Sequence, residues 1–146
     1  VINISAALSG QWKYVTDEIH TIVTLAHEHQ RQVKVIFENC YLQDQHKQRL
    51  CGICSDLGAD WVKTSTGFGT SGAMMDDLAL MVQHARHPTQ VKAAGGVRDL
   101  ETLLKVRELG VTRVGASATA AILDPARQAC GLDPVQLQSE SNANGY

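Results

Sequence analysis

Five short segments of the chain alternate apolar and polar residues with a period of two. They are Val1–Ser5, Val33–Glu38, Trp61–Ser65, Val91–Gly96 and Arg113–Ser117. Side chains alternate between the two faces of a β-strand. Each segment therefore predicts a strand with one apolar face and one face that holds polar groups. We expect helices to cover the apolar faces, and the other faces to line a polar interior.

Between these segments the apolar residues recur at helical spacing. The four patterns are Val15–Ala26, Leu50–Leu57, Leu78–Ala85 and Leu100–Val106. Residues that end or cap helices border them, namely Gly58, Pro88, Asp99 and Gly110. A short apolar turn is expected around Ala120–Leu123. Strands that alternate with helices of this length predict right-handed βαβ units and a parallel sheet, so the fold class is α/β.

Two of the predicted strands carry a lysine shortly before a glycine turn. Lys63 lies in WVKTSTGFG and Lys92 in VKAAGGVR. Either lysine alone is best interpreted as an ordinary residue that snorkels from the end of a strand. Two lysines on the polar faces of successive strands predict lysine chemistry instead. Burial and a second nearby cation both lower the pKa of an amine, and the free amine is nucleophilic toward a carbonyl.

Composition limits the classes of function. The 146 residues are 44% hydrophobic with a net charge of −2, which gives no electrostatic case for binding nucleic acid or an anionic membrane. We find no apolar run near the roughly 20 residues of a membrane-spanning helix. The four cysteines lack zinc-ligand spacing, and Cys51 and Cys54 fall inside a predicted helix, where packing is expected. No metal site is expected, and unpatterned cysteines favour a cytoplasmic setting.

The two ends of the chain carry further expectations. The first residue is Val1 and the first methionine is Met74, so we expect the chain to begin inside a longer protein. Residues 136–146 read QLQSESNANGY, which is polar and rich in small residues. We therefore expect one domain segment over residues 1–135 and a polar, flexible tail over residues 136–146.

Four stretches of the sequence resemble a known family. VKVIFENCYL, GADWVKTSTGFGTSGA, VKAAGGVRDLETLL and GVTRVGAS are similar to deoxyribose-phosphate aldolase, a class I (Schiff-base) aldolase on a TIM barrel. The resemblance runs from Val1 to about Leu123. It implies that the five predicted strands are the fourth to eighth of an eight-stranded barrel. Five strands cannot close such a barrel, so a partial barrel is expected.

The resemblance also assigns roles to single residues. Lys63 matches the lysine that forms the Schiff base, and Lys92 matches the second lysine, which lowers the pKa of the first. Lys34 matches a lysine that lines the same interior. The acidic proton-relay residue of the family would lie upstream of Val1, so no residue here takes that role. Tyr146 ends a tail like the one that carries a proton-transferring tyrosine in some members.

A phosphate site is expected beside these lysines. TIM barrels often bind phosphate with the loops after the seventh and eighth strands, and glycines let backbone N–H groups approach an anion. The candidate residues are Gly67, Gly95, Gly96, Arg98, Gly115 and Ser117. Phe68 and Ala118 stand where some members have a lysine and a serine, which removes two phosphate donors. An ordinary β-to-α turn is the alternative interpretation of the glycine pair.

The resemblance implies reversible cleavage of 2-deoxy-D-ribose 5-phosphate to acetaldehyde and D-glyceraldehyde 3-phosphate. No cofactor is expected, because the lysine itself supplies the electron sink. The expected partner is a small phosphorylated sugar, and a homo-oligomer is a further expectation. Two alternatives stay open: another Schiff-base aldolase acting on a phosphorylated sugar, or a non-catalytic fragment that binds sugar phosphate or a partner chain.

For the chain alone we expect marginal folding or self-association and little aldolase activity. An open half-barrel would expose its strand edges and its interior-facing residues to water. Those residues are Lys34, Glu38, Lys63 and Lys92.

Overall fold

Four strands form one parallel sheet in the computed structural model, which describes residues 1–135. The strands are β1 (Lys34–Ile36), β2 (Trp61–Lys63), β3 (Gln90–Ala94) and β4 (Arg113–Gly115), and they lie side by side in chain order. One helix connects each strand to the next: α3 (Asp44–Asp56), α4 (Met75–His84) and α5 (Leu100–Glu108). The prediction of an α/β fold with a parallel sheet is confirmed.

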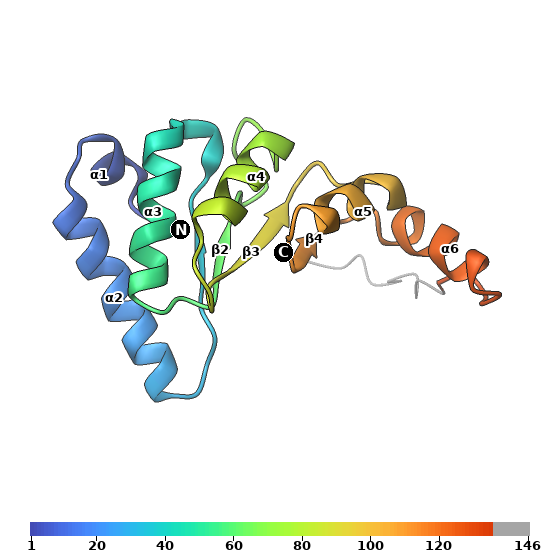
Figure 1. Cartoon of the computed structure of the whole chain (residues 1–146), viewed down its shortest axis with the longest axis horizontal. Helices are drawn as coiled ribbons and strands as arrows, with labels where there is room; N and C mark the ends of the chain where they lie inside the picture. Colours follow the sequence, from blue (N-terminus) through green and yellow to red (C-terminus); the bar gives the residue numbers. More distant parts are fainter. Residues whose placement is uncertain (136–146) are drawn as a thin grey trace, which may run out of the picture.

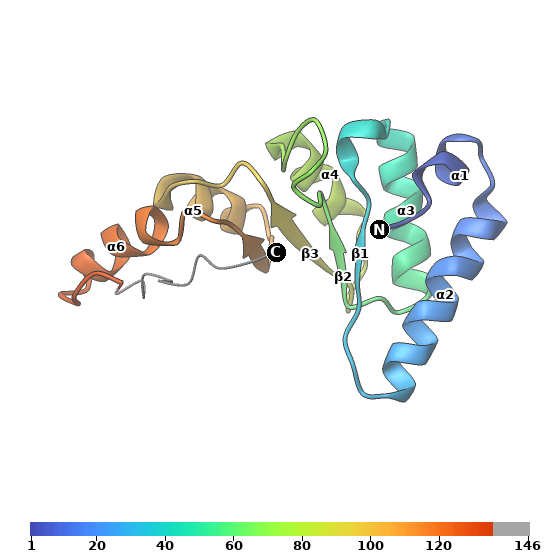
Figure 2. The same ribbon diagram turned by 180° about the vertical axis from the view of Figure 1, so that it is seen from behind.

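The remaining helices lie at the two ends of the sheet. They are α1 (Ile4–Leu8) and α2 (Trp12–Glu28) before β1, a short 3-10 turn η1 (Asn39–Tyr41) after it, and α6 (Thr119–Ala129) after β4. In Figures 1 and 2, α2 and α3 lie side by side near β1, whereas α5 and α6 extend from the β4 end. Among the described residues, no helix is both long and apolar enough to cross a membrane.

The alternation of side chains predicted for the strands agrees with the packing. One face of the sheet carries the buried residues Val35, Val62, Val91 and Ala93. They join a single hydrophobic core with apolar residues of the helices, which include Val15, Ile19, Leu50, Leu78, Met81, Val106 and Ile122. Removing this apolar surface from water is the main favourable term in folding. The helices thus cover one face, and the other face is left for polar side chains.

The predicted strand at Val1–Ser5 is wrong. The amide of Ile2 donates to the Ile36 carbonyl at 3.1 Å, so the chain follows the edge of β1 for one residue only. The side chain of Asn3 then accepts a hydrogen bond from the Ala6 amide at 3.0 Å and begins α1 at Ile4. Asparagine is a strong N-cap residue, and this cap turns the chain away from the sheet. The sheet therefore has four strands over residues 1–135 rather than five.

The short apolar turn predicted near Ala120–Leu123 is also wrong in extent. These residues belong to α6, which has 11 residues and continues through Pro125. The other helical patterns and their boundaries are confirmed. Asp99 caps α5 by accepting from the Thr102 amide at 2.7 Å, and Gly110 follows this helix with φ +101°, a left-handed conformation that favours glycine.

A buried ion pair joins α3 to α4. The Lys47 ammonium lies 2.5 Å from the Asp77 carboxylate and 3.0 Å from Asp44, and the lysine is only 6% exposed. Burial acts to lower the pKa of Lys47, but the hydrogen bonds and charges of Asp77 and Asp44 outweigh it and raise the pKa above its ordinary value. The stabilisation that comes from the raised pKa of Lys47 is therefore fully present at neutral pH and is lost as pH rises through that pKa.

We expect Asp77→Ala to lower the free energy of unfolding by about 1–3 kcal/mol, because it leaves a buried ammonium with one exposed partner. Denaturant unfolding of the protein that carries this sequence measures the change. Asp17→Ala is the matched control, because it breaks a pair at the surface. In that pair the Lys13 side chain is 88% exposed and the Asp17 side chain is 61% exposed. The control should change stability by less than about 0.5 kcal/mol. Equal effects of the two substitutions would contradict the role of the α3–α4 pair.

Candidate active site

The two lysines singled out by the sequence are neighbours across the sheet. The register pairs Ile36 of β1 with Lys63 of β2, Lys63 with Lys92 of β3, and Lys92 with Arg113 of β4. Residues paired in this way in a parallel sheet direct their side chains to the same face. Lys63, Lys92 and Arg113 therefore form a row of three cations on the face opposite the helices, and both lysines are half-buried.

The environment of Lys92 disfavours its charged form. Burial lowers the pKa of Lys92, and the positive charges of Lys63, Lys34 and Arg113 lower it further. The side chain of Lys92 lies against Gly115: a Cβ placed on this glycine would be 3.3 Å from Lys92 Cε and 3.6 Å from Nζ. Gly115 thus leaves the space that the lysine needs to lie over β4.

A pocket of about 500 Å³ opens beside this row. It is lined by both lysines and by all six residues predicted to bind phosphate. The remaining lining residues are Thr66, Ala94, Val97 and Ala116. The lysine pair and the predicted phosphate residues thus lie around one cavity at the ends of β2, β3 and β4, whereas Lys34 is not part of its lining.

Glycine is required where the loops after β2 and β3 meet. A Cβ on Gly72 would lie 2.6 Å from the Gly95 carbonyl carbon, and a Cβ on Gly95 would lie 2.9 Å from Gly72 Cα. The two backbones are therefore in direct contact. Gly95 and Gly96 also have φ of +79° and +84°, a left-handed conformation that side chains disfavour. Gly95 and Gly96 both line the pocket, so this left-handed backbone forms part of its wall.

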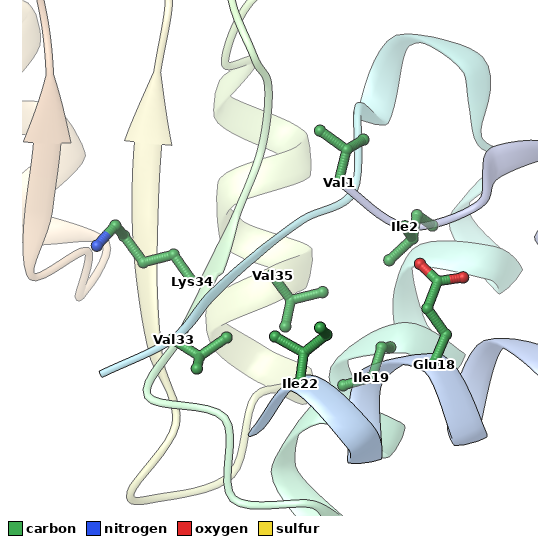
Figure 3. Close-up of a pocket in the computed structure, with 8 residues that line it drawn as sticks. All are labelled: Val1, Ile2, Glu18, Ile19, Ile22, Val33, Lys34 and Val35. Carbon is green, nitrogen blue, oxygen red and sulfur yellow. The ribbon is translucent and has the colours of Figure 1, made fainter. Parts of the chain in front are cut away.

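Lys34 lies on the same face as the lysine pair but outside the large pocket. Its Nζ is 5.7 Å from the centre of the Trp61 ring, and the Arg113 guanidinium lies 4.1 Å from that ring. Lys34 contributes to a separate apolar pocket of about 70 Å³ beside α2. Figure 3 shows its ammonium directed away from the other side chains of that pocket, which include Val33 and Val35. Lys34 therefore acts on Lys92 by charge rather than as part of the pocket.

The structure places two residues, Glu38 and Arg113, in surroundings that the sequence analysis did not predict. Glu38, expected to face the open interior, is only 4% exposed and hydrogen-bonds to Thr66, which lines the pocket. That expectation of exposure is wrong. Glu38 has φ +58° and ψ 64°, which breaks the alternation of the strand. Arg113 could have been found by extending the same alternation to the last strand.

Other candidates lie elsewhere or outside the described part. Tyr146 and the tail predicted over 136–146 lie outside the described residues. Cys51 and Cys54 are fully buried in α3, and burial raises the pKa of Cys51 to about 12, so this thiol does not ionise at neutral pH. Within residues 1–135, no three His, Cys, Asp or Glu side chains are grouped to hold a metal ion.

Known proteins share both the parallel α/β fold and the sequence around the lysine pocket. A model of the DeoC/LacD family aldolase matches residues 1–124. A deoxyribose-phosphate aldolase of Rhodopirellula baltica is 57% identical over 146 residues, which is 100% of this chain and 60% of the relative. One from Thermococcus gammatolerans is 45% identical over 129 residues, or 88% of this chain and 57% of the relative. The chain belongs to the DeoC/LacD family of aldolases.

Solved structures agree with this assignment. The aldolase QR15 superposes with a TM-score of 0.79 at 34% identity, over 89% of this chain and 59% of that structure. The tetrameric deoxyribose phosphate aldolase of Aeropyrum pernix gives a TM-score of 0.71 at 30% identity, over 79% of this chain and 50% of that structure. The chain spans between half and two thirds of the length of these relatives.

The charge coupling between the two lysines can be measured directly. Removing the Lys63 charge by Lys63→Met should raise the pKa of Lys92 toward its ordinary value, since the Lys63 charge lowers it. An NMR titration of the lysine ε-amino groups follows this change. Lys105→Met is the control, because Lys105 is an exposed lysine of α5 paired with Glu101. A Lys92 pKa that stays the same in both variants would contradict the coupling.

Proposed function

We propose that the protein carrying this sequence cleaves 2-deoxy-D-ribose 5-phosphate reversibly to acetaldehyde and D-glyceraldehyde 3-phosphate, with Lys63 as the Schiff-base lysine. The observation that carries the proposal is the in-register pair of Lys63 and Lys92 at one wall of a pocket of about 500 Å³. A pocket of this size is in the range of small-molecule sites. The DeoC/LacD family match and the deoxyribose-phosphate aldolase relatives support the same reaction.

The reaction begins when the free amine of Lys63 attacks the C1 aldehyde of the open-chain sugar. The carbinolamine loses water to give an iminium, which is an electron sink for the next step. The C2–C3 bond then breaks as the C3 hydroxyl loses its proton, and C3 leaves as the aldehyde of glyceraldehyde 3-phosphate. The remaining two-carbon enamine takes a proton at C2, and water hydrolyses the iminium to release acetaldehyde. Lysine supplies the electron sink, so these steps need no metal or organic cofactor.

Each cation near the pocket has a role in this scheme. Lys92 is the second lysine beside the nucleophile. The positive charges of Lys34 and Arg113 help to lower the pKa of Lys92, so they disfavour its protonated form. The phosphate lies against the backbone of Gly95, Gly96 and Gly115, with Arg98 and Ser117 as further donors. Gly67 completes this wall from the loop after β2. Tyr146 is proposed as a proton donor to the enamine.

The setting of the enzyme is part of the proposal. We infer a cytoplasmic protein, because the four cysteines show no disulfide framework in the sequence and such enzymes act on intracellular metabolites. A homo-oligomer is supported by the tetrameric Aeropyrum pernix relative. The substrate is a small phosphorylated sugar rather than a macromolecule.

Lys63→Leu should abolish covalent labelling when the protein is reduced with borohydride in the presence of acetaldehyde, since the iminium nitrogen is lost. Mass spectrometry of proteolytic peptides locates the label. Lys105→Leu, which removes an exposed lysine that does not line the pocket, should leave labelling intact. A label on Lys92 in the unmodified protein, with Lys63 free, would show that the nucleophile is misassigned. No label at all would favour a non-catalytic role.

Ser117→Ala should raise the KM for 2-deoxyribose 5-phosphate with little change in kcat, because the lost hydroxyl contacts a group that does not react. One such hydrogen bond to a charged group is worth about 1.5–3 kcal/mol, or roughly a tenfold to hundredfold rise in KM. Ser9→Ala is the control, since Ser9 follows α1 and lines none of this pocket. A change confined to kcat would argue against phosphate binding by Ser117.

A further inference from the structure

A buried carboxylate holds the turn that follows Lys63. The Thr66 amide donates to both oxygens of Glu38, at 3.1 Å to Oε1 and 3.2 Å to Oε2, and the Thr66 hydroxyl donates to Oε2. The Thr66 oxygen in turn accepts from the Phe68 amide at 3.0 Å. Both neighbours of Gly67 are therefore tied to the same carboxylate, Thr66 directly and Phe68 through the Thr66 hydroxyl.

The Glu38–Thr66 contact connects the segments after β1 and β2 at the point where their backbone hydrogen bonds end. The Phe37 amide donates to the Lys63 carbonyl and the Asn39 amide to the Thr64 carbonyl. Beyond Thr64 the two segments separate, and the side chain of Glu38 makes the next connection, to Thr66. The loop also closes over the carboxylate, because a Cβ on Gly69 would lie 3.0 Å from Glu38 Oε1 and 2.7 Å from Cys40 Sγ.

The backbone of Glu38 adopts a conformation that is energetically unfavourable for a residue other than glycine. Its φ of +58° and ψ of 64° fall in the left-handed region, which residues other than glycine adopt rarely. Strained residues of this kind cluster at functional sites. The conformation turns the side chain out of the alternation of β1 and toward the loop after β2. Among the described residues the Glu38 carboxylate makes no ion pair, and its hydrogen-bond donors are the amide and hydroxyl of Thr66.

We propose that Glu38 is a positioning residue that sets the phosphate selectivity of the site through Thr66. Glu38 does not line the pocket, whereas Thr66 and Gly67 do. By fixing Thr66 and Phe68, the carboxylate fixes the direction of the Gly67 backbone between them. This inference rests on the proposed function and adds a residue that determines how the phosphate end of the substrate is held.

The test compares 2-deoxyribose 5-phosphate with 2-deoxyribose as substrates. Glu38→Gln replaces one acceptor oxygen by an amide that cannot accept from Thr66. The ratio of kcat/KM for the phosphorylated over the unphosphorylated sugar should fall about tenfold, through a higher KM for the phosphorylated one. Glu101→Gln is the control, an exposed carboxylate of α5 paired with Lys105, and the ratio should stay within about twofold.

A second pair of variants decides the question if Glu38→Gln does not fold. Thr66→Val removes the hydroxyl that donates to Glu38 and should lower the ratio in the same way. Thr66→Ser keeps that hydroxyl and should recover most of the ratio relative to valine. Equal losses on both substrates in Thr66→Val would assign the contact to general stability and overturn the inference. An unchanged ratio would overturn it as well.

Failure of this inference can be separated from failure of the proposed function. Borohydride labelling with acetaldehyde involves no phosphate, so it reports the Schiff base alone. Normal labelling of Lys63 with an unchanged substrate ratio overturns only the role of Glu38. Absence of labelling in the unmodified protein overturns the proposed function, and the selectivity role of Glu38 falls with it.

Discussion

The register of the parallel strands is the constraint on which the site depends. Lys63 and Lys92 face each other only because Val62 is paired with Val91 and both are buried against the helices. A shift of either strand by one residue would move its lysine into the hydrophobic core and its buried residue to the polar face. The core packing that stabilises the fold therefore also fixes the distance between the two amines. The contacts that stabilise the fold are thus the ones that bring the two lysines together.

That register also concentrates charge. Three cations, Lys63, Lys92 and Arg98, line the large pocket, and its described lining includes no carboxylate. Two further cations, Lys34 and Arg113, are exposed and lie over the Trp61 ring. This concentration of positive charge attracts anions, and it contributes to lowering the pKa of Lys92. Both properties come from the same cluster of like charges.

The sequence alone predicts the parallel sheet and the lysine pair. The rule behind these predictions also explains why Glu38 and the first segment were predicted wrongly. Alternation along a strand is a geometric rule, so Lys63 and Lys92 were predicted on one face and the glycine loops beside them. The rule fails where the backbone leaves the extended region, as Glu38 does with φ +58°. It fails again at Asn3, where a single side-chain cap decides between strand and helix. Contacts such as Glu38–Thr66 join residues 28 apart and leave no local pattern.

The contact between Gly72 and Gly95 constrains how this site can evolve. Each backbone occupies the space that a side chain on the other would need, since a Cβ added to Gly72 would lie only 2.6 Å from the Gly95 carbonyl carbon. Neither position can accept a larger residue before the other has moved away, so a stepwise mutational path through this contact is closed. A moved loop would carry with it the Gly95–Gly96 wall of the pocket. New substrate preferences are therefore more accessible through the loop after β4, where Ala116 and Ser117 line the pocket and are exposed.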